Sequence, residues 1–140
     1  MKTFAKLGVV LLLLVALFVP VSAHEGREVG DYVIELGWRV EPAYTTLFNG
    51  PEFTVVTHGD EKGVEGLEDT LSIEVAYGGK TKVLRLHTLS GTPGHYIADL
   101  IPTQPGDYSF RIIGTIGDLE VDELFDAANG EFSSVEPISD

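Results

Sequence analysis

Cysteine is absent from this 140-residue chain. No disulfide can therefore staple the fold, no thiolate can bind a metal, and no lipobox thiol can carry a lipid. We expect core packing alone to hold the folded state. Catalytic patterns are missing as well: the sequence has no G-x-S-x-G elbow, no H-E-x-x-H pair and no glycine-rich phosphate loop. These absences predict that the protein is not an enzyme.

Basic residues are scarce. The chain has nine Lys and Arg against 22 Asp and Glu, and Lys2 and Lys6 stand in an N-terminal segment that we expect to be removed. The remainder carries seven basic and 22 acidic residues, a net charge of −15. Such a surface repels nucleic acid and anionic lipid headgroups, and it attracts metal cations and basic partners. Solubility or a saline habitat would explain the same charge without any ligand.

Residues 1–23 have the organisation of a signal peptide. Lys2 and Lys6 supply a positive segment, residues 7–19 are apolar apart from Gly8, and Ala23 ends a small-residue cleavage site. The apolar run is short of the ~20 residues that a spanning helix needs, and an uncleaved anchor is the alternative. We therefore expect an extracytoplasmic protein, periplasmic or secreted, whose only membrane contact is this segment if it stays uncleaved.

Alternating apolar and polar residues predict about seven short strands between residues 32 and 125. Turn signals such as Gly78-Gly79 separate the strands at intervals typical of an all-β, immunoglobulin-like β-sandwich. The inward row of the first strand is expected to end at Val40. The expected strands are 32–40, 52–58, 70–77, 81–87, one around 96–100, 108–115 and 119–125.

Residues 94–110 organise the predicted sandwich. Tyr108 follows Gly106 by two residues, the spacing of a tyrosine corner, in which the phenol hydroxyl bonds to backbone upstream. Tyr96 and Phe110 are expected to face the core. His95 is the exception, because it faces outward and has no evident structural role.

The segments around the sandwich are polar. Residues 24–31 are predicted to be a flexible lead-in, and residues 126–140 an acidic surface tail. Residues 60–69 lack the order of a calcium loop and are expected to be a solvated loop. Tyr44, Leu47 and Phe48 are expected to fold back as a lid on the core, with an exposed apolar patch for a partner as the alternative.

Cleavage after Ala23 would make His24 the first residue of the mature chain. A free α-amine and an imidazole on one residue can chelate Cu(II), and nitrogen donors favour copper over other divalent first-row metals. His87 and His95 flank one predicted hairpin on outward rows, so their imidazoles are expected to approach each other across the ladder. The candidate metal ligands are His24, His87 and His95; His58 is the only other histidine.

Two stretches resemble known families. Gly94-His95-Tyr96 with the PGDYSF run at 105–110 resembles the closing strands of YtkA-like extracytoplasmic domains, which are immunoglobulin-like sandwiches often associated with metal handling at the cell surface. His24 behind a signal peptide resembles CopC-type periplasmic copper carriers, whose mature chain begins with a ligating histidine. The Asp–His ligand pair of that family is not found near this C-terminus, so the resemblance implies a copper role for His24 alone.

These observations favour a non-catalytic extracytoplasmic binding module, with copper as the candidate cofactor and His24 as its ligand. The alternative is a structural or protein-interaction sandwich domain of a cell-surface or periplasmic complex, with a protein partner and no metal.

Overall fold

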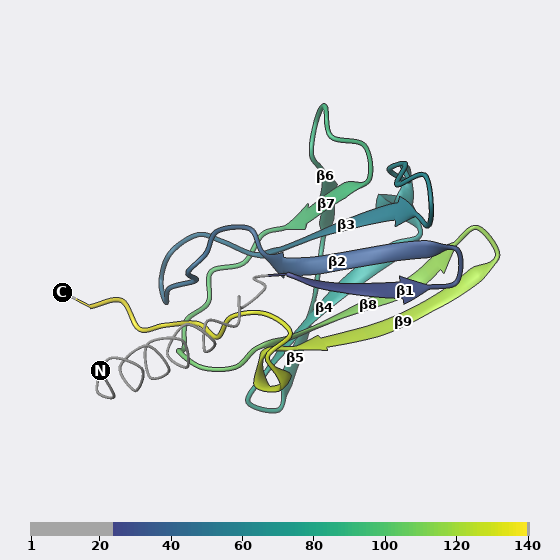
Figure 1. Ribbon diagram of the computed structural model, residues 1–140. Helices are drawn as coiled ribbons and strands as arrows, with labels where there is room; N and C mark the ends of the chain where they lie inside the picture. Colours follow the sequence, from purple (N-terminus) through teal and green to yellow (C-terminus); the bar gives the residue numbers. More distant parts are fainter. Residues whose placement is uncertain (1–23, 140) are drawn as a thin grey trace, which may run out of the picture.

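The computed structural model describes residues 24–139. Two antiparallel sheets pack face to face, one of five strands in the order β1-β2-β3-β7-β6 and one of four in the order β5-β4-β8-β9 (Figure 1). The all-β sandwich predicted from the alternating pattern is confirmed. The signal peptide predicted for residues 1–23 lies outside the described residues.

The described chain contains nine strands and two short 3-10 helices. The strands are β1 (Glu25–Val29), β2 (Tyr32–Trp38), β3 (Pro51–Thr57), β4 (Leu71–Tyr77), β5 (Lys80–Leu84), β6 (Leu86–Thr88), β7 (His95–Ala98), β8 (Ser109–Ile116) and β9 (Leu119–Asp126). The 3-10 helices are Leu67–Asp69 and Ala127–Asn129.

Two differences raise the strand number from the expected seven to nine. The expected strand 81–87 is divided at Arg85, where the chain leaves the four-stranded sheet as β5 and enters the five-stranded sheet as β6. The second difference is β1, which the sequence did not predict. In addition, β2 ends at Trp38, so Val40 is 56% exposed and does not extend the inward row.

The prediction of a flexible lead-in over residues 24–31 is wrong. Residues 25–29 pair antiparallel with β2 along their whole length, from Glu25 opposite Leu36 to Val29 opposite Tyr32. The turn between the two strands uses Gly30 at a φ of 59°, a conformation that glycine adopts without steric cost. Backbone pairing with β2, rather than apolar side chains, makes this polar segment a strand.

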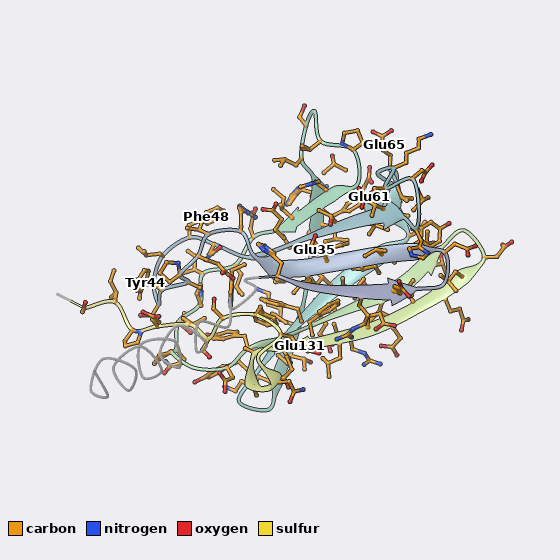
Figure 2. The ribbon with its side chains drawn as sticks, in the orientation of Figure 1. Glu35, Tyr44, Phe48, Glu61, Glu65 and Glu131 are labelled. Atoms are coloured by element: carbon orange, nitrogen blue, oxygen red, sulfur yellow. The ribbon has the colours of Figure 1, made fainter. Side chains whose placement is uncertain are left out.

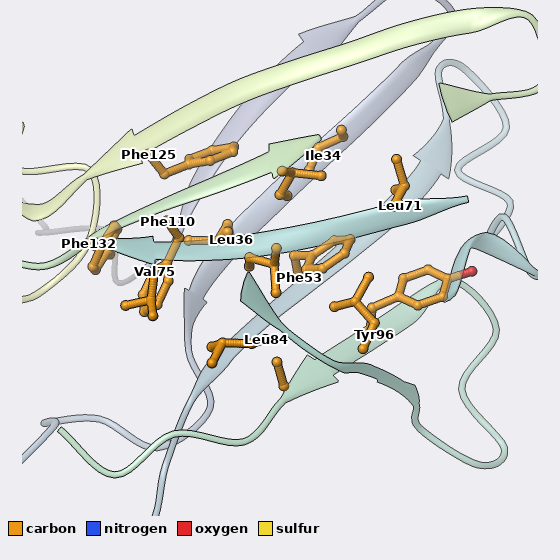
Figure 3. Packing of buried hydrophobic residues seen from close by; sticks show 14 of the residues in the cluster. Ile34, Leu36, Phe53, Leu71, Val75, Leu84, Tyr96, Phe110, Phe125 and Phe132 are labelled. Atoms are coloured by element: carbon orange, nitrogen blue, oxygen red, sulfur yellow. The ribbon is translucent and has the colours of Figure 1, made fainter. Parts of the chain in front are cut away.

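The core lies between the two sheets, and its side chains come from alternate positions of nearly every strand (Figure 3). Ile34, Leu36 and Phe53 cover it from the five-stranded sheet, and Ile73 and Phe110 cover it from the other. All five are at most 1% exposed. This packing substitutes for the disulfides that the chain cannot form.

The prediction of an acidic surface tail over residues 126–140 is also wrong for residues 126–135. Trp38, the single tryptophan, donates its Nε1–H to the backbone oxygen of Ser133 at 2.8 Å. Phe132 is buried and stacks on Phe110 with 5.2 Å between ring centres, and Val135 exchanges two backbone hydrogen bonds with Gly106. The tail therefore closes one end of the core and satisfies the only indole nitrogen.

The tyrosine corner is confirmed. The Tyr108 hydroxyl donates to the backbone oxygen of Gln104 at 3.0 Å and accepts from the Gln104 N–H at 3.3 Å. The lid expected from Tyr44, Leu47 and Phe48 is not formed, because Phe48 is 60% exposed and Leu47 46% exposed. This loop instead presents apolar side chains to solvent.

Replacing Tyr108 by Phe should lower the free energy of unfolding by about 1 kcal/mol, because the Gln104 backbone loses both hydrogen bonds. Urea denaturation measures the change. Tyr32→Phe is the matched control, since Tyr32 packs against the core and its hydroxyl makes no hydrogen bond within residues 24–139. Equal stability of Tyr108→Phe and wild type would contradict a stabilising corner.

Candidate functional site

All four histidines belong to the five-stranded sheet or its borders. His24 precedes β1, His58 follows β3, and His87 and His95 lie in β6 and β7. In the last two strands the histidines alternate with inward, buried residues (Leu86 beside His87, Tyr96 beside His95), which places their imidazoles on the outer face of the sheet. The four-stranded sheet carries no histidine.

The strand register brings one of these histidines into a row with a carboxylate. Thr54 of β3 lies opposite both Glu35 of β2 and His95 of β7, so these three residues form one line across the outer face. Glu52 stands two positions along β3 from Thr54 and therefore points to the same face. Figure 2 shows Glu35 over the front of β2.

A hollow of about 240 Å³ lies over this row, and we call it the histidine hollow. His24 and His95 contribute to its wall, although they are 71 positions apart in the sequence. Its lining residues are His24, Glu35, Glu52, Phe53, Thr54 and His95. The structure thus brings together two of the three predicted metal ligands and adds two carboxylates that sequence reasoning missed.

His95 is held against one of these carboxylates. Its Nδ1 lies 3.5 Å from Oε1 of Glu52, a distance for an ion pair with a protonated imidazole but too long for a good hydrogen bond. The same Nδ1 atom is buried and has no hydrogen-bond partner. A buried ring nitrogen left without a partner costs about 1–3 kcal/mol. A cation between Nδ1 and the Glu52 carboxylate would remove that cost.

The position of His24 depends on how β1 is anchored. Arg27 of β1 reaches across to β9 and to the segment after it: its guanidinium lies 3.0 Å from Glu123 of β9 and 2.7 Å from Glu131, which follows the second 3-10 helix. It also donates to the backbone oxygen of Leu124 at 2.8 Å and lies 4.2 Å from the ring centre of Phe125. These contacts close the open side of the sandwich beside β1. They hold the strand whose first residue follows His24.

The third predicted ligand is placed elsewhere. His87 lies opposite Ile97, two positions from His95, and its Nε2 is 3.6 Å from Asp99. Asp99 also pairs with Arg39 at 3.0 Å. His87 is therefore not among the residues that line the histidine hollow, and its imidazole faces the Asp99 carboxylate that Arg39 also contacts.

A second, larger hollow of about 670 Å³ adjoins the first and shares Glu35, Thr54 and His95 with it. Its far side is formed by His58 and the loop after β3, including Glu61, which Figure 2 shows at the edge of the sheet. His58 Nε2 lies 3.4 Å from Glu28. The outer face is thus a shallow surface on which imidazoles alternate with carboxylates.

Side chains alone do not complete a metal site in the part of the chain that the structure describes. No group of three or more His, Asp or Glu side chains within residues 24–139 is arranged to hold a metal ion. A site in the histidine hollow would need a donor that is not a side chain. The α-amine that cleavage after Ala23 would create on His24 is such a donor.

Comparisons with protein-family models, with curated proteins and with solved structures gave no match to this chain. The likeness to YtkA-like and CopC-type domains stays a prediction from a few residues. Among residues 24–139, no helix has the length and apolar character required to cross a bilayer.

The loop at the edge of the larger hollow is ordered by one carboxylate. The Thr57 hydroxyl donates to Asp60, and the Lys62 backbone N–H adds a weaker bond; together they hold the pKa of the Asp60 carboxyl below its usual value of 3.8. Because the folded-state pKa is lowered, this stabilisation is present above the unfolded value and lost as pH falls through the folded one.

Thr57→Val should therefore raise the pKa of Asp60 towards 3.8, since the largest cause of the lowering is removed. Carboxyl carbon shifts followed by NMR between neutral and acidic pH measure it. Asp122, whose pKa is lowered by Arg111 on the other sheet, is the internal control and should be unchanged. An unaltered Asp60 titration in the variant would show that the hydroxyl does not set its pKa.

Proposed function

We propose that the mature protein is a non-catalytic extracytoplasmic module that binds one Cu(II) ion in the histidine hollow. The observation that carries the proposal is the shared wall of His24 and His95, two of the three histidines that the sequence predicts as metal ligands. One is the expected mature N-terminus, and the other is an outward histidine without a structural role. Their placement in one hollow supports a joint role.

The donor set fits copper better than other biological divalent ions. His24 would supply an α-amine and an imidazole after cleavage, and the imidazole of His95 would supply a third nitrogen. Nitrogen donors rank Cu(II) highest among the divalent first-row metals. Glu52, 3.5 Å from His95 Nδ1, and Glu35 on the same wall would offset the positive charge of the ion.

Copper would be the bound ion, and residues of the protein would hold it in place. The pairing of β1 with β2 and the contacts of Arg27 hold the strand that begins directly after His24. The pairing of β3 with β7 places His95 opposite Thr54. Because both ladders belong to one sheet, the two histidines are preorganised relative to each other. A preorganised pair loses less conformational entropy on binding than two mobile side chains.

A Cu(II) titration of the mature protein tests the proposal. Protein that begins at His24 should bind one ion, and the same protein with one extra N-terminal residue should bind at least about tenfold more weakly, because the α-amine of His24 becomes an amide. Isothermal calorimetry with glycine as a competing ligand measures both affinities.

Two histidine variants sharpen this test. His95→Gln should weaken binding in the protein that begins at His24, whereas His87→Gln, which removes a histidine of the same sheet outside the hollow, should not. Equal affinity of the extended and unextended forms would overturn the role of the His24 amine. An effect of His87→Gln as large as that of His95→Gln would overturn the choice of hollow.

A further inference from the structure

The distribution of positive charge on this acidic protein is uneven. Of the seven Lys and Arg residues between positions 24 and 140, three fall within six positions: Lys80, Lys82 and Arg85. The other four are engaged with acids, since Arg27, Arg39 and Arg111 form ion pairs and the charge of Lys62 acts on Asp60. Lys80, Lys82 and Arg85, which we call the β5 cations, have no ion pair with any described residue.

Lys80 and Lys82 stand on a free sheet edge, and Arg85 directly follows the last residue of that edge strand. β5 pairs with β4 on one side, and no strand of the described chain lies on its other side. Four of its five residues are exposed, including the apolar Val83 at 61%. The unpaired backbone N–H and C=O groups of such an edge can accept an additional strand.

An apolar hollow of about 200 Å³ lies beside this edge. Tyr77 and Tyr108, whose rings stack with 4.5 Å between centres, form part of its wall, and Leu100, Ile101 and Pro102 form another part. Lys80 and Lys82 stand among its lining residues. Ile101 is 51% exposed, so apolar surface remains open to a partner directly beside two unpaired cations.

We propose that the β5 edge binds an extended, acidic segment of another protein as an added strand. The backbone of that segment would pair with β5, its carboxylates would meet the β5 cations, and its apolar side chains would enter the hollow. Lysines on an edge strand oppose pairing with a neutral or basic strand. An acidic strand would instead be attracted, because its carboxylates have the opposite charge to these lysines. The surface lies on the four-stranded sheet and is independent of the histidine hollow.

Features of the chain disfavour other occupants. The acidic strand of a second copy, β9, already commits Asp122 to Arg111 at 2.6 Å and Glu123 to Arg27 at 3.0 Å. An anionic membrane would meet a chain whose net charge after residue 23 is −15. A free fatty acid would leave the backbone edge unpaired.

Amide NMR of the mature protein with a synthetic probe tests the proposal. The probe is a capped peptide of alternating Glu and Val, long enough to pair with all of β5, and the reference is the same peptide with Lys in place of Glu. The acidic peptide should shift the amide signals of residues 80–85 and 100–103, and the basic peptide should not. Lys82→Glu should weaken binding of the acidic peptide by about fivefold.

Lys62→Glu is the matched control, because it makes the same change of charge at an exposed site away from β5 and should leave the affinity unchanged. Thermal unfolding confirms that both variants fold. Absence of shifts at residues 80–85, or equal weakening by Lys62→Glu, would overturn the proposal. Shifts at these residues caused by laurate, by phosphatidylglycerol vesicles or by concentrating the protein alone, but not by the acidic peptide, would also overturn it in favour of that occupant.

Discussion

The Arg27 side chain links β1, the edge strand of the five-stranded sheet, to the opposite side of the sandwich. β1 contributes a single apolar residue to the core, Val29, and its other attachment to the opposite sheet is Arg27. That side chain makes two ion pairs, a hydrogen bond to a backbone oxygen and a contact with the Phe125 ring. Each partly exposed ion pair contributes about 1 kcal/mol at most, so these contacts add to the backbone pairing of β1 with β2 and do not replace it. The placement of His24 depends on it.

The two ends of the described chain stabilise the sandwich in different ways. The N-terminal strand is attached by backbone pairing and by charge, whereas the C-terminal segment is attached by apolar burial through Phe132 and Val135 and by the carbonyl that accepts from Trp38. In a chain without cysteine, both ends thus contribute what a disulfide often contributes in exported domains. Neither end covers the outer face of the five-stranded sheet where the histidine hollow lies.

Most of the fold could be predicted from the period-two pattern, since the inward residues of β2, β3, β4 and β8 are apolar almost without exception. β1 was not predicted because its central inward residue is Arg27, and a charged residue there breaks the apolar alternation expected of a strand. Burial of Phe132 and Val135 had a signal, because both are large apolar residues in a mostly polar tail. No feature of the sequence indicated that His24 and His95 line one hollow, because that arrangement follows from the pairing of β1 with β2 and of β3 with β7. His87 was grouped with His95 from the hairpin alone, and a register offset of two residues sends it to Asp99 instead.

We propose that β1, with Arg27 as its link to the opposite sheet, holds His24 in the hollow that His95 also lines, so that both histidines bind one copper ion. Pulsed electron paramagnetic resonance of the Cu(II) protein beginning at His24 counts the coordinated imidazoles directly. We expect two coordinated imidazoles in the wild type, one in His95→Gln, and a mixture of both in Arg27→Met, whose β1 lacks the ion pairs to Glu123 and Glu131. Identical spectra for the wild type and His95→Gln would contradict it.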